Sequence, residues 1–290
     1  MHAVKIWLLA ARPKTLFAVV CPVLVGTTIA FSLGHFNPWI FAFTLLTGLA
    51  IQISTNFCND YFDFIKGADT KNRKGPLRVT QSGLVPVHTM KKVCVVSLLA
   101  TALFGIVLIW HGGWIIALLV ALSILLAVGY TAGPVPLAYK GLGDLFVFVA
   151  FGPVACLGCY YLQTANINLE CNIVGLALGS LSTAILAVNN IRDIEEDQKS
   201  GKKTLVVRFG IVFGKMEYVI LLLIPSIISL LLSVQRPLLL LSLLYLIPAT
   251  IVMTNVIYNN NPYKLNGYLA KTGILLFIYT TLFCVGWLLS

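Results

Sequence analysis

The sequence predicts an all-α, polytopic membrane protein with one domain that covers residues 1–290. Three observations lead to this fold class. Charged residues make up only 10% of the chain and hydrophobic residues 59%, whereas soluble domains carry about 25% charged residues. The mean hydropathy is +0.93, and many apolar runs approach the roughly 20 residues that a helix needs to cross a bilayer. These runs do not alternate as the strands of a membrane barrel do, so helices are expected.

Residues 1–14 form a short amphipathic lead-in that ends in Arg12-Pro13-Lys14. Nine spans are expected after it, at 15–33, 39–58, 93–110, 114–131, 144–163, 173–190, 217–234, 238–256 and 272–289. With a cytoplasmic N-terminus, 19 of the 20 Lys and Arg residues fall on the cytoplasmic side and only Arg236 falls outside. The positive-inside rule therefore predicts a multi-pass protein of the cell inner membrane with its N-terminus in the cytoplasm. The net charge of +10 is then explained by topology, and nucleic acid is not expected as a partner.

Polar cap loops are expected on the cytoplasmic side, at about 64–92, 131–143 and 191–216. The middle one is rich in Gly and Pro, which break helices and favour a shaped loop. The other two follow spans that run inward, the second and the sixth.

The acids are concentrated at the start of these two loops. Seven of the ten lie there: Asp60, Asp63, Asp69, Asp193, Glu195, Glu196 and Asp197. Helical spacing places Asn56, Asp60 and Asp63 on one face, here called the first acidic face. A step of four residues likewise joins Asn189, Asp193 and Asp197 into the second acidic face. A single carboxylate at a helix end often only reaches toward water, but two matched sets beside basic clusters favour a site.

Two such faces point to divalent-metal and diphosphate chemistry. Magnesium prefers oxygen ligands, typically one or two carboxylates together with substrate phosphates. All six residues of the two acidic faces are expected to act as metal ligands, and the four aspartates among them are the expected catalytic residues: Asp60, Asp63, Asp193 and Asp197. Lys and Arg side chains nearby would bind the remaining phosphate oxygens. The four histidines form no helical pair, so a zinc site is not expected.

Several segments resemble the intramembrane aromatic prenyltransferases of the UbiA type. They are ARPKTL (11–16), NDYFDFIKGADT (59–70), YTAGPVPLAYKGLGD (130–144), FGPVACLGCYYLQT (151–164) and NNIRDIEEDQKSGKKTLVVRFG (189–210). Within that superfamily they most resemble the branch that prenylates 1,4-dihydroxy-2-naphthoate in menaquinone synthesis. One departure is Gly67, which stands where many relatives carry a third acid; here that acid is Asp69. Beside the second acidic face, Glu196 is an alternative to Asp197 as a metal ligand.

The resemblance implies a nine-helix bundle with a cavity that opens to the cytoplasm and sideways to lipid. In it, Mg²⁺ would support transfer of a polyprenyl group from polyprenyl diphosphate to the naphthoate, with loss of carbon dioxide. Residues expected to bind the diphosphate or the aromatic acid are Arg12, Asn56, Asn59, Lys66, Arg73, Arg78, Tyr139, Lys140, Lys202, Lys203 and Arg208. Arg12 and Lys140 are the candidates for the acceptor carboxylate.

Other functions stay open on the sequence. The acceptor can be another aromatic such as hydroxybenzoate or homogentisate, since pocket shape decides this. Membrane carboxylates also occur in cation-coupled transporters, and a structural or receptor role is a third alternative. The expected partners are the two substrates and the lipid bilayer, and the sequence indicates no protein partner.

Overall fold

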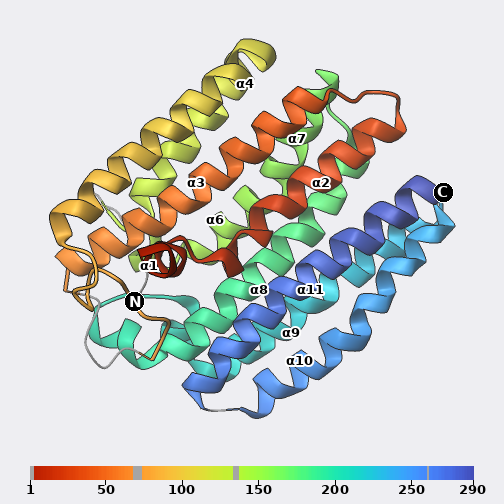
Figure 1. Cartoon of the computed structure of the whole chain (residues 1–290). Helices are drawn as coiled ribbons and strands as arrows, with labels where there is room; N and C mark the ends of the chain where they lie inside the picture. The colour runs from red at the N-terminus through yellow and green to blue at the C-terminus, as the bar shows by residue number, and fades with distance from the viewer. Residues whose placement is uncertain (1–2, 68–73, 133–136, 260) are drawn as a thin grey trace.

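The computed structural model describes residues 3–67, 74–132, 137–259 and 261–290, and all regular structure in these ranges is helical (Figure 1). The helices form one bundle, whose long members run from lower left to upper right in Figure 1, with the N-terminus toward the lower left and the C-terminus at the upper right. In chain order the elements are α1 (Ala3–Ala11), η1 (Pro13–Thr15), α2 (Phe17–Ser32), α3 (Pro38–Ile65), α4 (Val87–Gly129), α5 (Leu137–Lys140), α6 (Gly143–Val149), η2 (Ala150–Val154), α7 (Ala155–Thr164), α8 (Leu169–Lys199), α9 (Leu205–Ser233), η3 (Pro237–Tyr245), α10 (Leu246–Tyr258) and α11 (Pro262–Leu289).

Seven helical stretches in the described residues are long and apolar enough to cross a membrane. The count becomes eight if the segment Ala3–Thr15 and α2, which are bent by 51° to each other, form one broken span. These helices confirm the all-α membrane fold class. The protein is therefore a multi-pass membrane protein.

The helix α4 is two antiparallel segments joined at Gly113. Its 43 residues would extend about 65 Å at roughly 1.5 Å per residue, about twice the hydrocarbon core of a bilayer. Gly113 has φ 69° and ψ −155°, a conformation that breaks the helix and favours glycine. The two halves pack closely, since a Cβ at Gly105 would lie only 2.8 Å from Val120 Cγ1. Counting them separately would bring the candidate spans in the described residues to nine, and the number of crossings stays a prediction.

The helix α8 is the centre of the bundle and contacts α2, α6, α7, α9 and α11. Small residues allow this close packing. Gly175 and Gly179 face the π-helical turn η2, where a Cβ on Gly152 would lie 2.5 Å from the Gly175 carbonyl oxygen. Such small residues let membrane helices approach closely. This contact fixes α6 beside the polar end of α8.

The cap segments are shorter than the sequence predicts. Helix α8 continues to Lys199, and α9 begins at Leu205 behind Thr204, whose hydroxyl accepts a hydrogen bond from the amide of Val207. The expected polar loop at 191–216 is therefore mostly helix, and the connection between the helices is 200–204. The acidic faces belong to helix ends that project past the apolar spans, because their spacing of three and four residues continues the helix. The first cap, the segment expected at about 64–92, lies between the end of α3 at Ile65 and the start of α4 at Val87.

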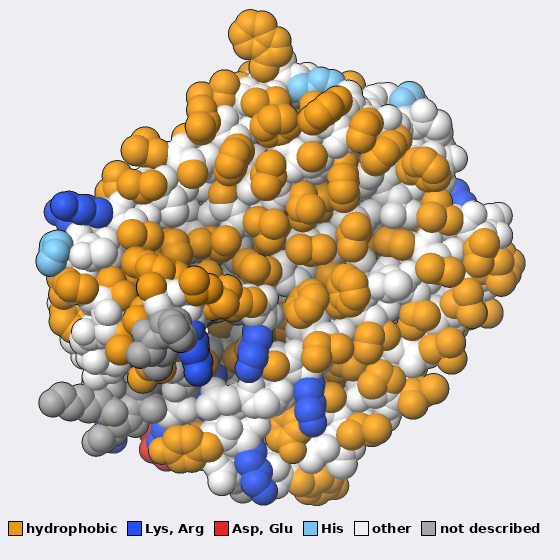
Figure 2. Space-filling model, viewed as in Figure 1, with side chains coloured by type: hydrophobic (Ala, Val, Ile, Leu, Met, Phe, Trp, Pro, Cys, Tyr) orange, Lys and Arg blue, Asp and Glu red, His pale blue; other side chains and the backbone are white. Residues whose placement is uncertain are grey.

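The surface is apolar, as a lipid environment requires. Hydrophobic side chains cover most of the face seen in Figure 2, and Lys and Arg gather mainly toward the end that carries the N-terminus. Arg236 is at the opposite end, with its guanidinium carbon 3.8 Å from the Trp287 ring centre and its Nε 3.9 Å from Glu170 Oε1.

Candidate active site

Five of the six residues of the two acidic faces line one cavity of about 440 Å³ between α2, α3, α4, α6, α7 and α8. The predicted site residues that line it are Arg12, Asn56, Asn59, Asp63, Arg78, Asn189, Asp193, Asp197 and Lys202. Residues more than a hundred positions apart in the chain therefore meet here, at the end of the bundle that carries the N-terminus. The rest of the lining is largely apolar, so the cavity has a polar mouth, formed by these residues, and an apolar interior.

Other predicted residues do not line this cavity: Asp60, Lys66, Tyr139, Lys140, Lys203 and Arg208. Arg73 and Asp69 lie outside the described residues, so the structure does not place them.

Asp60 holds a turn of the first cap. Its carboxylate is buried, and its two oxygens accept hydrogen bonds from the backbone amides of Val79 (3.2 Å) and Thr80 (3.1 Å). The neighbouring Arg78 is thereby directed to Asp63, with 2.9 Å between its Nη2 and Asp63 Oδ2. Asp60 thus acts on the cavity through the position of Arg78.

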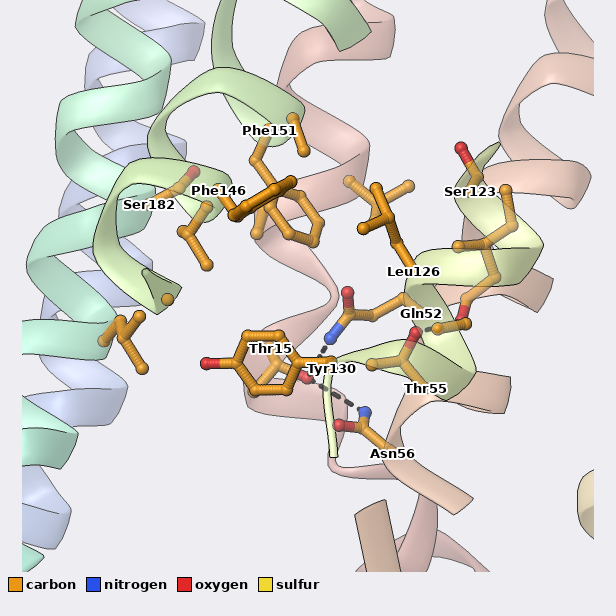
Figure 3. A pocket seen from close by; sticks show the side chains of 18 of the residues that line it. Thr15, Gln52, Thr55, Asn56, Ser123, Leu126, Tyr130, Phe146, Phe151 and Ser182 are labelled. Atoms are coloured by element: carbon orange, nitrogen blue, oxygen red, sulfur yellow. Dashed lines mark hydrogen bonds between the residues drawn. The ribbon is translucent and has the colours of Figure 1, made fainter. Parts of the chain in front are cut away.

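Asn56 holds the turn between α1 and α2 in a similar way. Its Nδ2 donates to the Ala11 carbonyl (2.9 Å) and to Thr15 Oγ1 (3.2 Å). Gln52 also donates to Thr15 Oγ1, at 3.2 Å (Figure 3). Within this turn Arg12 has a φ of 51°, the left-handed region that non-glycine residues rarely occupy. Asn56 therefore stabilises a strained turn that places Arg12 at the cavity.

Asp63 carries a carboxylate oxygen suited to a ligand. Its Oδ1 is buried and has no hydrogen-bond partner in the described part of the chain, although its Oδ2 is paired with Arg78. A buried polar atom left without a partner costs about 1–3 kcal/mol, and more when it is charged. On the other wall, Asp197 Oδ1 lies 3.7 Å from Lys202 Nζ.

Arg192 is a site residue that the sequence analysis assigned only to topology. It is buried inside α8, and its guanidinium binds the next residue, Asp193, through two bonds of 2.6 Å. The same group donates to Asn189 Oδ1 at 2.6 Å and to Asn266 Oδ1 at 2.8 Å. The signal available in the sequence was the position of Arg192 between Asn189 and Asp193. Arg192 orients two of the three residues of the second acidic face.

Basic residues at the rim join the cap segments. Arg208 donates to the carbonyls of Lys203 (3.0 Å) and Lys140 (2.7 Å), which ties the middle cap segment, 131–143, to the start of α9. Lys66 Nζ lies 4.7 Å from the ring centre of Tyr139 and donates to the Thr131 carbonyl at 2.5 Å.

Lys74 bridges the first cap to α8. Its amide donates to Glu196 Oε1 at 2.6 Å, and its Nζ is 2.5 Å from Glu195 Oε2. The bond to Glu195 raises the pKa of Lys74 above its ordinary value.

The donor set fits magnesium bound together with a diphosphate. Among the described residues, no three His, Cys, Asp or Glu side chains are grouped so that they hold a metal by themselves. Magnesium does not require such a group, because substrate phosphates and water complete its coordination. The buried, unpartnered Oδ1 of Asp63 and the carboxylate of Asp197, both at the cavity, are ligands of the required type.

Asp144 and Tyr130 add polar groups to the cavity lining, and the sequence analysis assigned no role to either. Asp144 is buried in the first turn of α6, and its Oδ1 accepts a hydrogen bond of 3.2 Å from Asn190 Nδ2. The Tyr130 hydroxyl lies against Gly143, where a Cβ would be 3.1 Å from the phenolic oxygen. An acid at the start of the fifth expected span was the signal.

Comparison with known proteins gives one family. The model of the UbiA prenyltransferase family matches residues 19–281. A 1,4-dihydroxy-2-naphthoate octaprenyltransferase from Escherichia coli (strain K12) is 38% identical over 222 residues, which cover 74% of this chain and 72% of that protein. An enzyme of the same name from Haemophilus influenzae is 33% identical over 297 aligned positions, covering 99% of this chain and 96% of that protein.

A solved structure of a UbiA homologue from Archaeoglobus fulgidus, bound to GPP and Mg²⁺, has the same fold. It matches with a TM-score of 0.68 at 16% identity and covers 97% of this chain and 99% of that one.

Proposed function

Because the chain belongs to the UbiA prenyltransferase family, we propose that it joins a polyprenyl group to 1,4-dihydroxy-2-naphthoate in menaquinone synthesis. The donor is polyprenyl diphosphate, the carboxyl group of the acceptor is lost as carbon dioxide, diphosphate is released, and the product is the quinol form of demethylmenaquinone. The observation that carries this proposal is the meeting of two Asn/Asp helix ends, α3 and α8, on one largely apolar cavity. The names of the relatives support the choice of acceptor.

Magnesium would be held by Asp63 and Asp197 together with the diphosphate. When bound there, it neutralises negative charge that builds up on the leaving diphosphate. Asp193 lines the same cavity with its two carboxylate oxygens bonded to Arg192, and Asn59 and Asn189 line it too. We assign Asn56 and Asp60, which the sequence also placed among the ligands, to positioning roles, because their side chains hold turns.

The cationic side chains at the cavity have separate tasks. Arg78 and Lys202 line it beside Asp63 and Asp197, so they suit the outer oxygens of the diphosphate. Arg12 lies at the turn across the mouth and suits the carboxylate of the acceptor. The polyprenyl tail would follow the apolar lining, which includes Val23, Leu119 and Val154.

In the transfer step, the allylic C–O bond breaks and the diphosphate leaves with the electron pair. A ring carbon of the naphthoate forms the new C–C bond, and the carboxyl group on that carbon departs as carbon dioxide. Water would quench an allylic cation, so the apolar lining protects the reaction. We place the enzyme in the inner membrane with a cytoplasmic N-terminus, because 19 of the 20 basic residues fall on the expected cytoplasmic side.

Product analysis with a panel of acceptors tests this proposal. Purified protein receives one long polyprenyl diphosphate, Mg²⁺ and either dihydroxynaphthoate, hydroxybenzoate or homogentisate. The expected result is one prenylated naphthalene product with one equivalent of carbon dioxide, and no product from the other acids. Prenylation of hydroxybenzoate or homogentisate in its place would assign the protein to another aromatic acceptor.

A further inference from the structure

Asp144 is a buried carboxylate whose position matches no task in diphosphate binding. Its side chain lines the cavity, is 5% exposed, and is held by Asn190. Asn190 precedes Asp193 by three residues, so it lies about 4.5 Å farther into the bundle along α8. Ionisable groups within membrane proteins are costly and usually functional. Asp144 thus lies one layer below the diphosphate mouth, where the reacting carbons would meet.

A second, independent observation lies deeper on α8. Ser182 is 3% exposed and lines the cavity, and its hydroxyl has no hydrogen-bond partner in the described part of the chain. The hydroxyl of the next residue, Thr183, donates to the Asp144 carbonyl at 3.5 Å, which places this turn of α8 against the start of α6. Buried polar groups usually have a partner, so a buried hydroxyl that faces a cavity without one is suited to bond to a ligand atom.

Aromatic side chains line the same region. Figure 3 shows Phe146 and Phe151 beside Ser182, on the side of the cavity away from Asn56 and Gln52. Tyr130 extends across the middle of the view, and its hydroxyl points away from Gln52. Ring faces favour offset or edge contacts with another aromatic ring. These walls suit a flat, aromatic ligand.

We propose that Asp144 binds the 1-hydroxyl of the acceptor, next to the carbon that carries the carboxyl group, and accepts its proton, while Ser182 bonds to the 4-hydroxyl. This assignment rests on the proposed function. The phenolic proton moves to Asp144, and the ring oxyanion supplies the electron pair with which the ring carbon attacks the allylic carbon. Diphosphate leaves with its electron pair. Loss of carbon dioxide returns an electron pair to the ring, and the ring oxygen takes the proton back from Asp144.

Substitution Asp144→Asn keeps the shape of the side chain and removes the proton acceptor. General-base groups contribute roughly 10²–10⁴-fold to rate, so the transfer rate should fall at least 100-fold. The KM for polyprenyl diphosphate should stay within twofold, because the head group binds one layer away. Glu170→Gln is the control: it also removes a carboxylate from a helix of the bundle, and Glu170 lies at the opposite end, beside Arg236, and does not line the cavity.

An acceptor analogue with methoxy groups in place of the ring hydroxyls gives a readout independent of turnover. By calorimetric titration, the wild-type protein should bind the dihydroxy acid at least tenfold more tightly than the dimethoxy acid. Asp144→Asn should reduce this preference to less than threefold. An unchanged preference, or a rise in donor KM without a loss of rate, would overturn the assignment.

If Asp144→Asn does not fold, Ser182→Ala is the second variant that tests the proposal. It should weaken binding of the 1,4-dihydroxy acid at least fivefold and leave binding of the 1-hydroxy acid unchanged; equal effects on both would contradict the inference. If the wild-type protein prenylates no naphthoate, the proposed function fails, and the binding preferences still decide the role of Asp144.

Discussion

Arg78 and Asp63 form a buried ion pair at the cavity, with 2.9 Å between Arg78 Nη2 and Asp63 Oδ2. The pair occupies one oxygen of Asp63 and leaves Oδ1 buried without a hydrogen-bond partner in the described residues. One residue of the first acidic face is therefore both fixed in place and able to accept a ligand.

Substitution of Arg78 should separate charge from geometry. Arg78→Lys keeps the positive charge beside Asp63 but loses the planar, bidentate fork of arginine. We expect near-wild-type stability and at least a tenfold rise in KM for polyprenyl diphosphate, measured by steady-state kinetics. Arg78→Leu should also lower the thermal midpoint in detergent. Unchanged donor affinity in both variants would remove Arg78 from diphosphate binding.

Asp60 and Asp63 should differ in their effect on magnesium. Asp60→Asn weakens the bonds to Val79 and Thr80, so it should lower thermal stability and keep the magnesium concentration for half-maximal rate within twofold. Asp63→Asn should raise that concentration at least tenfold. If Asp60→Asn raises the magnesium requirement as much as Asp63→Asn does, Asp60 returns to the set of metal ligands.

Asn56 should act through Arg12. Asn56→Ala and Arg12→Ala are each expected to raise the KM for the naphthoate about tenfold, because Asn56 holds the turn that presents Arg12. In the Arg12→Ala background, adding Asn56→Ala should change this KM less than twofold. A double-mutant cycle in acceptor kinetics measures the coupling. Multiplicative effects of the two substitutions would show that Asn56 has a separate role.

Arg192 should be a large contributor to stability. Arg192→Gln leaves the buried Asp193 carboxylate without its bidentate partner, and breaking a buried pair in this way costs about 3–5 kcal/mol. Arg236→Gln is the control at the opposite end of the bundle, where the pair with Glu170 is partly exposed and about 1 kcal/mol or less is expected. Denaturation in detergent micelles compares the two, and similar losses would contradict the account.

The sequence predicted the membrane fold, the family resemblance and the faces of two distant helices that meet at one cavity. These follow from local signals, namely apolar length and a helical repeat of three or four residues. The comparisons confirm the fold class and the family. The extension of helix through 191–199 was missed because a polar sequence after a span was taken as a loop.

The role of each polar residue within the site required tertiary structure. Asn56, Asp60 and Asp63 share a helical face, yet the segment after Arg78 covers Asp60 and leaves Asp63 at the cavity. Asp144 gains its significance from Asn190, which is 46 residues away in the chain. The repeat pattern within one helix cannot predict this contact, because its two residues lie on different helices.

The central claim is that the ends of α3 and α8 hold magnesium and diphosphate together. The most direct measurement is the transfer rate as a function of free Mg²⁺ for the wild-type protein, Asp63→Asn, Asp197→Asn and the control Glu170→Gln. The account predicts a rate that falls to background on chelation in the wild type and the control, and at least a 100-fold loss in either aspartate variant with the fold intact. Metal-independent transfer, or normal turnover in either aspartate variant, would contradict it.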